Sequence, residues 1–221
     1  MIIGIGNKAR QGKDTAADFL KRRYGFIVIH FADALYDECK NCTILYSERE
    51  RAFYMRCYDE DYSKFINLPK HIVRWIKSKG IKESGLPFDA QFIYKGMREK
   101  DSSLLQFWGT EFRRKLFEWD YWVNKVKDII DKAPDKDYVI PDTRFRNEAR
   151  FIKVYGGEVW KVIRPNYDII DRDPRHKSEV DLDNWRYDEV IINDETIEEL
   201  YKKVDEVYQR RKKLYEKREN K

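Results

Sequence analysis

The segment from Ile2 to Thr15 constrains the fold more than any other part of the chain. It reads Ile-Ile-Gly-Ile-Gly-Asn-Lys-Ala-Arg-Gln-Gly-Lys-Asp-Thr. An unbroken apolar run at residues 2–6 predicts a buried strand, and an apolar stripe over residues 14–24 predicts a helix. A strand that enters a helix through such a loop presents backbone N–H groups and the positive end of the helix dipole to an anion. The segment therefore predicts a phosphate-binding loop.

Two residues depart from the pattern G-x-x-x-x-G-K-[ST], in which Gly12 and Lys13 are in place. Asn7 replaces the first glycine, and asparagine tolerates left-handed backbone angles better than most residues. Asp14 replaces Ser or Thr, which is favourable if Mg²⁺ separates it from phosphate or if it caps the helix, and Thr15 then supplies the hydroxyl. A strand-turn-helix with incidental Gly and Lys is the alternative. The expected nucleotide-binding residues are Asn7, Lys8, Ala9, Arg10, Gln11, Gly12, Lys13, Asp14 and Thr15.

Strands and helices alternate along most of the chain, which is typical of a parallel sheet covered by helices. Predicted helices follow the strands, the last of them over residues 196–218. The fold class expected is α/β, a three-layer P-loop NTPase fold with a mostly parallel five-stranded sheet. The predicted strands are residues 2–6, 26–31, 138–140, 159–163 and 190–192.

A length of 221 residues fits a single domain, residues 1–221, with room for an insertion. Residues 47–100 are less regular: helical spacing is clear only over 66–79, and glycine and proline follow. We interpret 47–100 as a largely helical insertion that covers the substrate. Residues 164–184 are polar and contain two prolines, and we expect them to form a lid loop.

The charge pattern argues against a nucleic-acid partner. Residues 202–221 hold nine Lys/Arg and four Asp/Glu, so the remaining residues hold 45 − 9 = 36 basic and 40 − 4 = 36 acidic side chains. A solvated helix end is a better interpretation of the basic tail than a nucleic-acid patch. No apolar run reaches the ~20 residues that span a membrane. Three cysteines without a clustered histidine fit buried thiols in a reducing cytosol better than a zinc or redox pair.

Five segments in order resemble the deoxynucleoside monophosphate kinases of tailed bacteriophages. The first is the Gly-Lys-Asp-Thr loop at Gly12–Thr15. The others are Leu105–Glu111 with Arg114, Tyr121–Val123, Val139–Phe145 with Asn147 and Glu148, and the C-terminal run at His176–Glu179, Val190–Asp194 and Glu198–Leu200. Together they cover residues 2–35 and 103–201, whereas 40–100 finds no convincing counterpart.

The resemblance implies an adenylate-kinase-like enzyme, a phosphotransferase that moves the terminal phosphate of ATP to a deoxynucleoside monophosphate with Mg²⁺. It also implies a viral source and the host cytoplasm as location. It leaves a homodimer open. The family commonly has Ala-x-Pro-Leu-Lys after its second strand, where this chain has Ala32–Tyr36, and it often has Arg where this chain has Ser102 and Ser103. Both departures would face the acceptor, so base choice or even substrate class can differ.

Phosphoryl transfer depends on cations around a charge-rich transition state more than on a nucleophilic residue. Lys13, Arg144, Arg114 and Asp142 are therefore the expected catalytic residues. Arg144 follows Asp142 at the carboxyl end of a strand, where ligands bind in open α/β sheets. We expect Asp14, Thr15 and Asp142 to hold Mg²⁺, although Asp142 as an N-cap stays open. The expected substrate residues are Asp33, Tyr36, Gln106, Thr110, Arg114, Arg144 and His176.

Two other functions remain alternatives. The first is a P-loop kinase for another small acceptor, such as dephospho-coenzyme A. The second is a non-catalytic nucleotide-binding or nucleic-acid-binding protein that uses the basic C-terminal helix.

Overall fold

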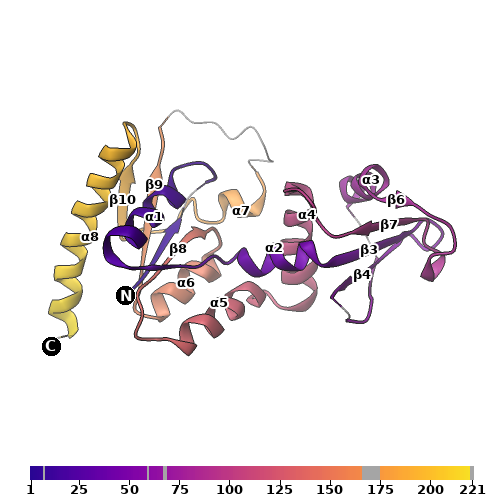
Figure 1. Cartoon of the computed structure of the whole chain (residues 1–221), viewed down its shortest axis with the longest axis horizontal. Coiled ribbons are helices and arrows are strands. Elements are labelled where there is room, and N and C mark those ends of the chain that lie inside the picture. Colours follow the sequence, from indigo (N-terminus) through magenta and orange to yellow (C-terminus); the bar gives the residue numbers. More distant parts are fainter. Residues whose placement is uncertain (7, 59, 67–68, 166–174, 220–221) are drawn as a thin grey trace. The chain divides into compact units, whose positions relative to one another are not determined.

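The computed structural model describes residues 1–6, 8–58, 60–66, 69–165 and 175–219, and it divides the chain into two compact units (Figure 1). We call residues 1–31 and 122–221 the parallel-sheet unit, and residues 32–121 the antiparallel-sheet unit. The second unit is thus wider than the insertion expected at 47–100. Each unit is described by itself.

The parallel-sheet unit is built on five strands in the order β10-β9-β1-β8-β2, and every neighbouring pair is parallel. This confirms the predicted five-stranded parallel sheet. The strands are β1 (Ile2–Gly6), β2 (Ile27–Val28), β8 (Tyr138–Thr143), β9 (Glu158–Ile163) and β10 (Glu189–Ile192).

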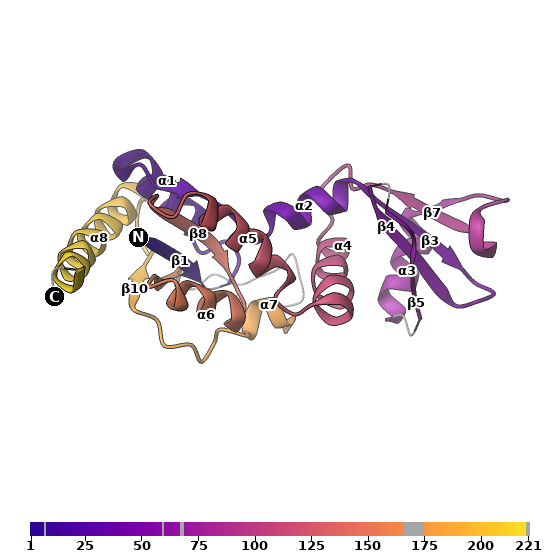
Figure 2. The same ribbon diagram turned by 90° about the horizontal axis from the view of Figure 1, so that it is seen from below.

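Helices cover both faces of this sheet, so the unit has three layers. Alternate residues of a strand point to opposite faces. Ile3 and Ile5 of β1 pack with the helices α1 and α8, whereas a Cβ on Gly4 would lie 2.3 Å from Ile152 Cδ1 of α6. Figure 2 shows β1 and β8 between α1 and α6. The helices are α1 (Lys13–Tyr24), α5 (Tyr121–Lys132), α6 (Arg146–Val154), α7 (Lys177–Val180) and α8 (Ile197–Glu219).

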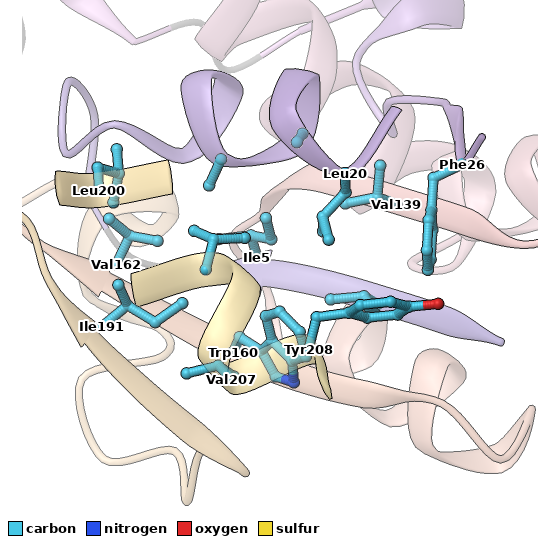
Figure 3. Packing of buried hydrophobic residues seen from close by; sticks show 14 residues of the cluster. Ile5, Leu20, Phe26, Val139, Trp160, Val162, Ile191, Leu200, Val207 and Tyr208 are labelled. Atoms are coloured by element: carbon cyan, nitrogen blue, oxygen red, sulfur yellow. The ribbon is translucent and has the colours of Figure 1, made fainter. Parts of the chain in front are cut away.

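The core of the parallel-sheet unit lies between the sheet and the pair α1 and α8 (Figure 3). Leu20 of α1, Trp160 of β9 and Leu200 of α8 are at most 2% exposed. Burial of each such side chain contributes about 1.5–3 kcal/mol, which holds α1 rigidly on the sheet. The loop between β1 and α1 is therefore fixed at both ends.

The antiparallel-sheet unit corrects the prediction of a largely helical insertion. Five strands in the order β5-β4-β3-β7-β6 form an antiparallel sheet that fills most of residues 42–95. The strands are β3 (Cys42–Ser47), β4 (Ala52–Cys57), β5 (Ser63–Phe65), β6 (Ile81–Lys82) and β7 (Phe92–Lys95). The helical elements are α2 (Asp33–Lys40), α3 (Lys70–Lys79), α4 (Ser102–Gln106) and the short 3-10 helix η1 (Pro87–Asp89), with the π-helix η2 (Phe107–Phe117).

The prediction failed because β3 and β4 lack an alternating pattern. Both strands are buried at five of six positions, so both sheet faces are covered and each strand has apolar neighbours in sequence rather than an apolar-polar alternation. Such a pattern does not separate a buried strand from a buried helix. The helix expected at 66–79 is found as α3, which packs on one face of the sheet through Trp75 and Tyr94, whose ring centroids are 4.8 Å apart (Figure 2).

Residues 102–117 form two helical segments of different kinds. Asp101 caps α4 by accepting hydrogen bonds from the backbone N–H groups of Ser103 (2.9 Å) and Leu104 (3.1 Å). The chain then continues as the π-helix η2. π-helical turns widen a helix and are frequent at functional sites.

The lid loop expected at 164–184 is described only in part, because residues 166–174 lie outside the described residues. Residues 177–180 form the short helix α7. In the part of the chain that the structure describes, no helix has the length and apolar character to cross a membrane.

Candidate active site

The predicted phosphate loop connects β1, which ends at Gly6, to α1, which begins at Lys13. Asn7 lies outside the described residues. Gly12 has a φ of 97°, in the left-handed region, and a Cβ there would lie 2.5 Å from Asn193 Nδ2. Glycine is thus required at position 12 by backbone conformation and by packing, in addition to the close approach of phosphate expected from the sequence.

Three hydrogen bonds attach this loop to distant parts of the parallel-sheet unit. The backbone N–H of Ala9 donates to Glu179 Oε2 (3.2 Å). The backbone N–H of Arg164 donates to the Gln11 side chain (2.6 Å), and Asn193 Nδ2 donates to the Gln11 carbonyl (3.0 Å). The loop therefore keeps its shape through partners on α7, after β9 and after β10.

Lys13 is a buried cation with a strongly perturbed pKa. Its side chain folds back into the loop, and Nζ donates to the Lys8 carbonyl. Burial, and then the positive charge of Arg144, lower the pKa of the Lys13 ammonium from its ordinary 10.5 to about 7. A buried lysine that shares its surroundings with an arginine is stabilised by an anion, and phosphate is the anion that such loops bind.

Arg144 and Glu179 form a buried ion pair next to the loop. One guanidinium nitrogen of Arg144 donates to Glu179 Oε1, and the Glu179 side chain is completely buried. The rest of the Arg144 side chain is one-fifth exposed, so it is accessible to a ligand. Among the described residues no other contact engages the guanidinium, which leaves donors for phosphate oxygens. Glu179 belongs to the family-like run His176–Glu179, but it was not among the site residues expected from the sequence.

The predicted metal-binding carboxylates Asp14 and Asp142 both act electrostatically on Lys13, which places them at the same end of the sheet. Asp14 is exposed and lies 3.7 Å from His30 Nε2, and a hydrogen bond from His30 lowers the pKa of the Asp14 carboxyl. Asp142 accepts a hydrogen bond from the backbone N–H of Phe31 (3.0 Å). The described residues contain no preformed cluster of three His, Cys, Asp or Glu side chains.

Asp142 does not cap the following helix, which was the alternative left open by the sequence. Glu148 does so instead, because its carboxylate accepts from the backbone N–H groups of Arg144 (2.7 Å) and Phe145 (3.0 Å). His176 has a local role as the N-cap of α7, where its Nδ1 accepts from the Ser178 backbone N–H at 3.2 Å.

The remaining predicted substrate residues lie in the antiparallel-sheet unit. Asp33 and Tyr36 belong to the first turn of α2, and Gln106 ends α4. Thr110 and Arg114 are one turn apart on η2, and Arg114 donates to the Trp119 carbonyl at 3.2 Å. The structure thus groups Lys13, Asp14, Asp142 and Arg144 in one unit and these five residues in the other.

Glu38 organises η2, and no sequence pattern indicated it. Its buried carboxylate accepts from Trp108 Nε1 (2.8 Å), Arg113 Nε (2.6 Å) and the Tyr121 hydroxyl (2.5 Å). The Arg113 guanidinium lies 4.9–5.7 Å from the ring centroids of four aromatic residues. The pair therefore fixes the π-helix next to Thr110 and Arg114.

The cysteines are buried, as the sequence analysis favoured. Burial raises the pKa of the Cys42 and Cys57 thiols to about 12 and raises that of Cys39 further. Thiols held in the protonated form are poor metal ligands and nucleophiles.

Comparison with known proteins places this arrangement in a family. Residues 98–204 match the model of the family described as "Deoxynucleotide monophosphate kinase". A putative deoxynucleotide monophosphate kinase of Acanthamoeba polyphaga mimivirus is 31% identical over 92% of this chain and 94% of its own length. The chain belongs to the deoxynucleotide monophosphate kinase family. This confirms the family that the ordered segments indicated.

Two further relatives are more distant. The deoxynucleotide monophosphate kinases of Escherichia phage RB69 and Enterobacteria phage T4 are each 24% identical, over 93% and 92% of this chain and 98% and 96% of their own lengths. Among solved structures, dephospho-CoA kinase from Campylobacter jejuni matches 95% of the chain and 96% of its own, with a TM-score of 0.45 and 15% identity. That last likeness has no bearing on function.

Proposed function

We propose that the protein transfers the terminal phosphate of ATP to a deoxynucleoside monophosphate, which yields the diphosphate. Family membership and the names of three relatives support this reaction. The observation that carries the proposal is the pair of cations Lys13 and Arg144 at the phosphate loop, where burial and then the Arg144 charge lower the pKa of Lys13. Two such cations are stabilised together when a polyphosphate enters.

We assign the ATP side of the reaction to the parallel-sheet unit. The α1 N-terminus and Lys13 bind the β- and γ-phosphates, because the backbone N–H groups at the start of a helix have no partners within the helix. Arg144 offsets the charge that spreads over the oxygens of the moving phosphoryl group. Glu179 supports both parts, because it holds the Arg144 guanidinium and the Ala9 backbone N–H at once.

Asp14, Thr15 and Asp142 are the residues that would hold Mg²⁺. Two carboxylates and a hydroxyl suit this ion, which kinases bind through one or two carboxylates together with nucleotide phosphates rather than in an all-protein cage. Bound Mg²⁺ neutralises charge on the β- and γ-phosphates. Asp14 and Asp142 both lie close enough to Lys13 to raise its pKa, which keeps negative charge beside the loop.

We assign the acceptor side to the antiparallel-sheet unit. Arg114 is the candidate cation for the acceptor phosphate, and Gln106 and Thr110 are candidates for contacts with its base or sugar. Glu38 and Arg113 keep the π-helix that carries Thr110 and Arg114 in one conformation. The reaction requires no general base, because the acceptor phosphate is already an anion near neutral pH.

A panel of acceptors tests the proposal. Purified protein with ATP and Mg²⁺ is given dAMP, dGMP, dCMP, dTMP, the ribonucleotides and dephospho-coenzyme A, and ADP release is measured. We expect turnover with at least one deoxynucleoside monophosphate. Turnover with dephospho-coenzyme A alone would show that this compound, and not a deoxynucleoside monophosphate, is the acceptor. The absence of ADP release with every acceptor would contradict kinase activity.

A further inference from the structure

Three basic residues of the C-terminal tail, which looked like the main cationic region in the sequence, are held in ion pairs with acids outside the tail. Lys203 pairs with Asp194 (2.7 Å), and Arg210 pairs with Glu189 (2.6 Å). Arg211 binds the Glu158 carboxylate through two nitrogens. These residues hold α8 on the sheet and are not available as a cationic surface.

A second cationic stretch is neutralised only in part, because Lys64 and Lys77 are its paired members. Residues 62–82 contain six Lys/Arg and no Asp/Glu, and five of the six lie on α3 and β6. The apolar residues Ile72, Trp75 and Ile76 of α3 are buried, so its basic residues point to solvent. The basic residues of α3 and β6 are Lys70, Arg74, Lys77, Lys79 and Lys82.

Pairing does not account for most of these charges. Lys77 pairs with Glu48 at 2.7 Å. Among the residues that the structure describes, Lys70, Arg74, Lys79 and Lys82 form no ion pair. Ion pairs like those that α8 forms with neighbouring acidic residues therefore do not neutralise these four side chains.

Helix stability does not account for them either. Cations near a helix C-terminus interact well with the helix dipole, which explains Lys77 and Lys79. Lys70 is the first residue of α3, where a positive charge is unfavourable, and the first turn contains no acidic residue. A positive charge at this end opposes the helix dipole, so helix stability does not explain Lys70.

We propose that the basic surface of α3 and β6 binds the phosphate backbone of nucleic acid. Lys70, Arg74 and Lys77 are spaced i, i+4, i+7 and form a row of about 10 Å, at 1.5 Å per residue. That row matches about three steps of 3.4 Å along one strand. Lys82 of β6 is the strand partner of Phe92 in β7, and Phe92 lies on the same sheet face as Tyr94, which contacts Trp75 of α3. Lys82 therefore extends the basic surface of α3.

The chemistry favours nucleic acid over an acidic protein. Protein interfaces are anchored by aromatic and apolar residues at their centre. Ile72, Trp75 and Ile76 of α3 are already buried within the unit, and the exposed residues of α3 are basic or polar. Contacts of this kind read phosphates without reading sequence. The inference does not depend on phosphoryl transfer, because it concerns a surface outside the candidate active site.

Fluorescence anisotropy with a labelled 20-base-pair duplex of mixed sequence tests the inference. We expect binding that weakens with KCl, with a slope of log K against log[KCl] of about −3.6 if four cations contact phosphates. The variant K70Q/R74Q/K79Q/K82Q should lose most of the affinity and most of this slope. The matched control K202Q/K212Q/K213Q/K217Q removes the same number of charges from α8 and should retain both. Circular dichroism melting of all proteins checks that each is folded.

The two variants give different results if the basic surface of α3 and β6 binds the duplex and if it does not. Loss of binding in the α8 variant with full binding in the α3 variant would overturn the inference, as would equal losses in both. Binding of poly-glutamate through α3 with no binding of the duplex would also overturn it, because the partner would then be an acidic protein surface. Salt-dependent duplex binding that only the α3 variant loses supports it.

Discussion

Each unit contains an arginine-glutamate ion pair, and the two pairs differ in the surroundings of the arginine. In the antiparallel-sheet unit, Glu38 accepts from three donors, and the Arg113 side chain is 7% exposed and surrounded by aromatic rings. In the parallel-sheet unit, Glu179 also accepts from three donors, but the Arg144 side chain is 21% exposed, and burial together with the Arg144 charge lowers the pKa of Lys13 to about 7. The first pair is enclosed, whereas Lys13 and Arg144 form an open cluster of two cations that an anion can stabilise.

The comparison teaches that an incompletely satisfied buried cation marks a binding site better than a buried ion pair does. Buried charges are costly unless they are paired and hydrogen-bonded. A chain that keeps Lys13 beside Arg144 accepts that cost before any ligand binds. Variants of the two regions test whether the Glu38–Arg113 pair affects stability and whether the open cluster of Lys13 and Arg144 affects activity.

The largest effect is expected from Lys13→Ala. We expect kcat/KM to fall by at least about 10³-fold, or about 4 kcal/mol, because the side chain offsets transition-state charge. Stability should not fall, since the variant removes a poorly solvated ammonium. Steady-state kinetics and thermal unfolding measure the two effects, with the exposed residue of the same helix in Lys21→Ala as control. Wild-type turnover in Lys13→Ala would show that Lys13 does not stabilise the transition state.

Glu38→Gln should act mainly on stability. We expect a loss of roughly 3 kcal/mol in the free energy of unfolding, because Arg113 is left as an uncompensated buried charge. Urea unfolding followed by tryptophan fluorescence measures it. Glu48→Gln breaks an exposed pair with Lys77 and should cost about 0–1 kcal/mol. Equal losses in the two variants would show that the Glu38 pair is no more important than a surface contact.

Glu179→Gln should reduce kcat by about 10-fold to 100-fold, the range expected for removing a hydrogen bond to a charged group, 1.5–3 kcal/mol. If Glu179 acts through Arg144, the same substitution should have little further effect in an Arg144→Ala background. Asp181→Asn is the matched control, because Asp181 binds the backbone N–H of the neighbouring Arg146 at 2.8 Å. If the losses of kcat from the two substitutions add in the double variant, Glu179 does not act through Arg144.

The smallest expected effect is the protonation of Lys13 when ATP binds. With a pKa of about 7, Lys13 is about 90% neutral at pH 8 in the free protein, and bound phosphate raises this pKa. Calorimetry at pH 8 in buffers of different ionisation enthalpy should show uptake of up to about 0.9 proton per ATP. The uptake should disappear in Lys13→Met. A binding enthalpy independent of buffer in the wild type would contradict the lowered pKa.

The same shift gives a stability effect with a defined sign. The folded-state pKa of Lys13 lies below its ordinary 10.5, so the folded state binds this proton less tightly than the unfolded state. The Lys13 contribution to stability therefore increases as pH rises from about 7 to 10.5 and is lost as pH falls back through that range. Comparison of Lys13→Met with the wild type across this range isolates the contribution.

Local pattern was enough to predict the parallel-sheet unit and the phosphate loop. Its strands are apolar runs between helices with clear stripes, and glycine precedes Lys13 at the start of α1. The antiparallel sheet was missed because β3 and β4 are covered on both faces, which removes the alternation that identifies a strand. Their β-branched and aromatic residues were the available signal for strands, and the turn between them, Glu48 to Arg51, contains no Gly, Pro, Asn or Asp that would indicate a hairpin.

The sequence by itself determined the P-loop unit and the family, and it proposed Lys13, Asp142 and Arg144 as candidates, because these depend on short segments and their order. Only the tertiary structure decided which charges are paired. Glu179 accepts from Ala9, 170 positions away in the sequence, Glu38 accepts from Arg113, 75 positions away, and Arg210 and Arg211 of the tail pair with acids on β10 and β9. Electrostatic compensation depends on distance in space, and folding brings together residues that no local pattern relates.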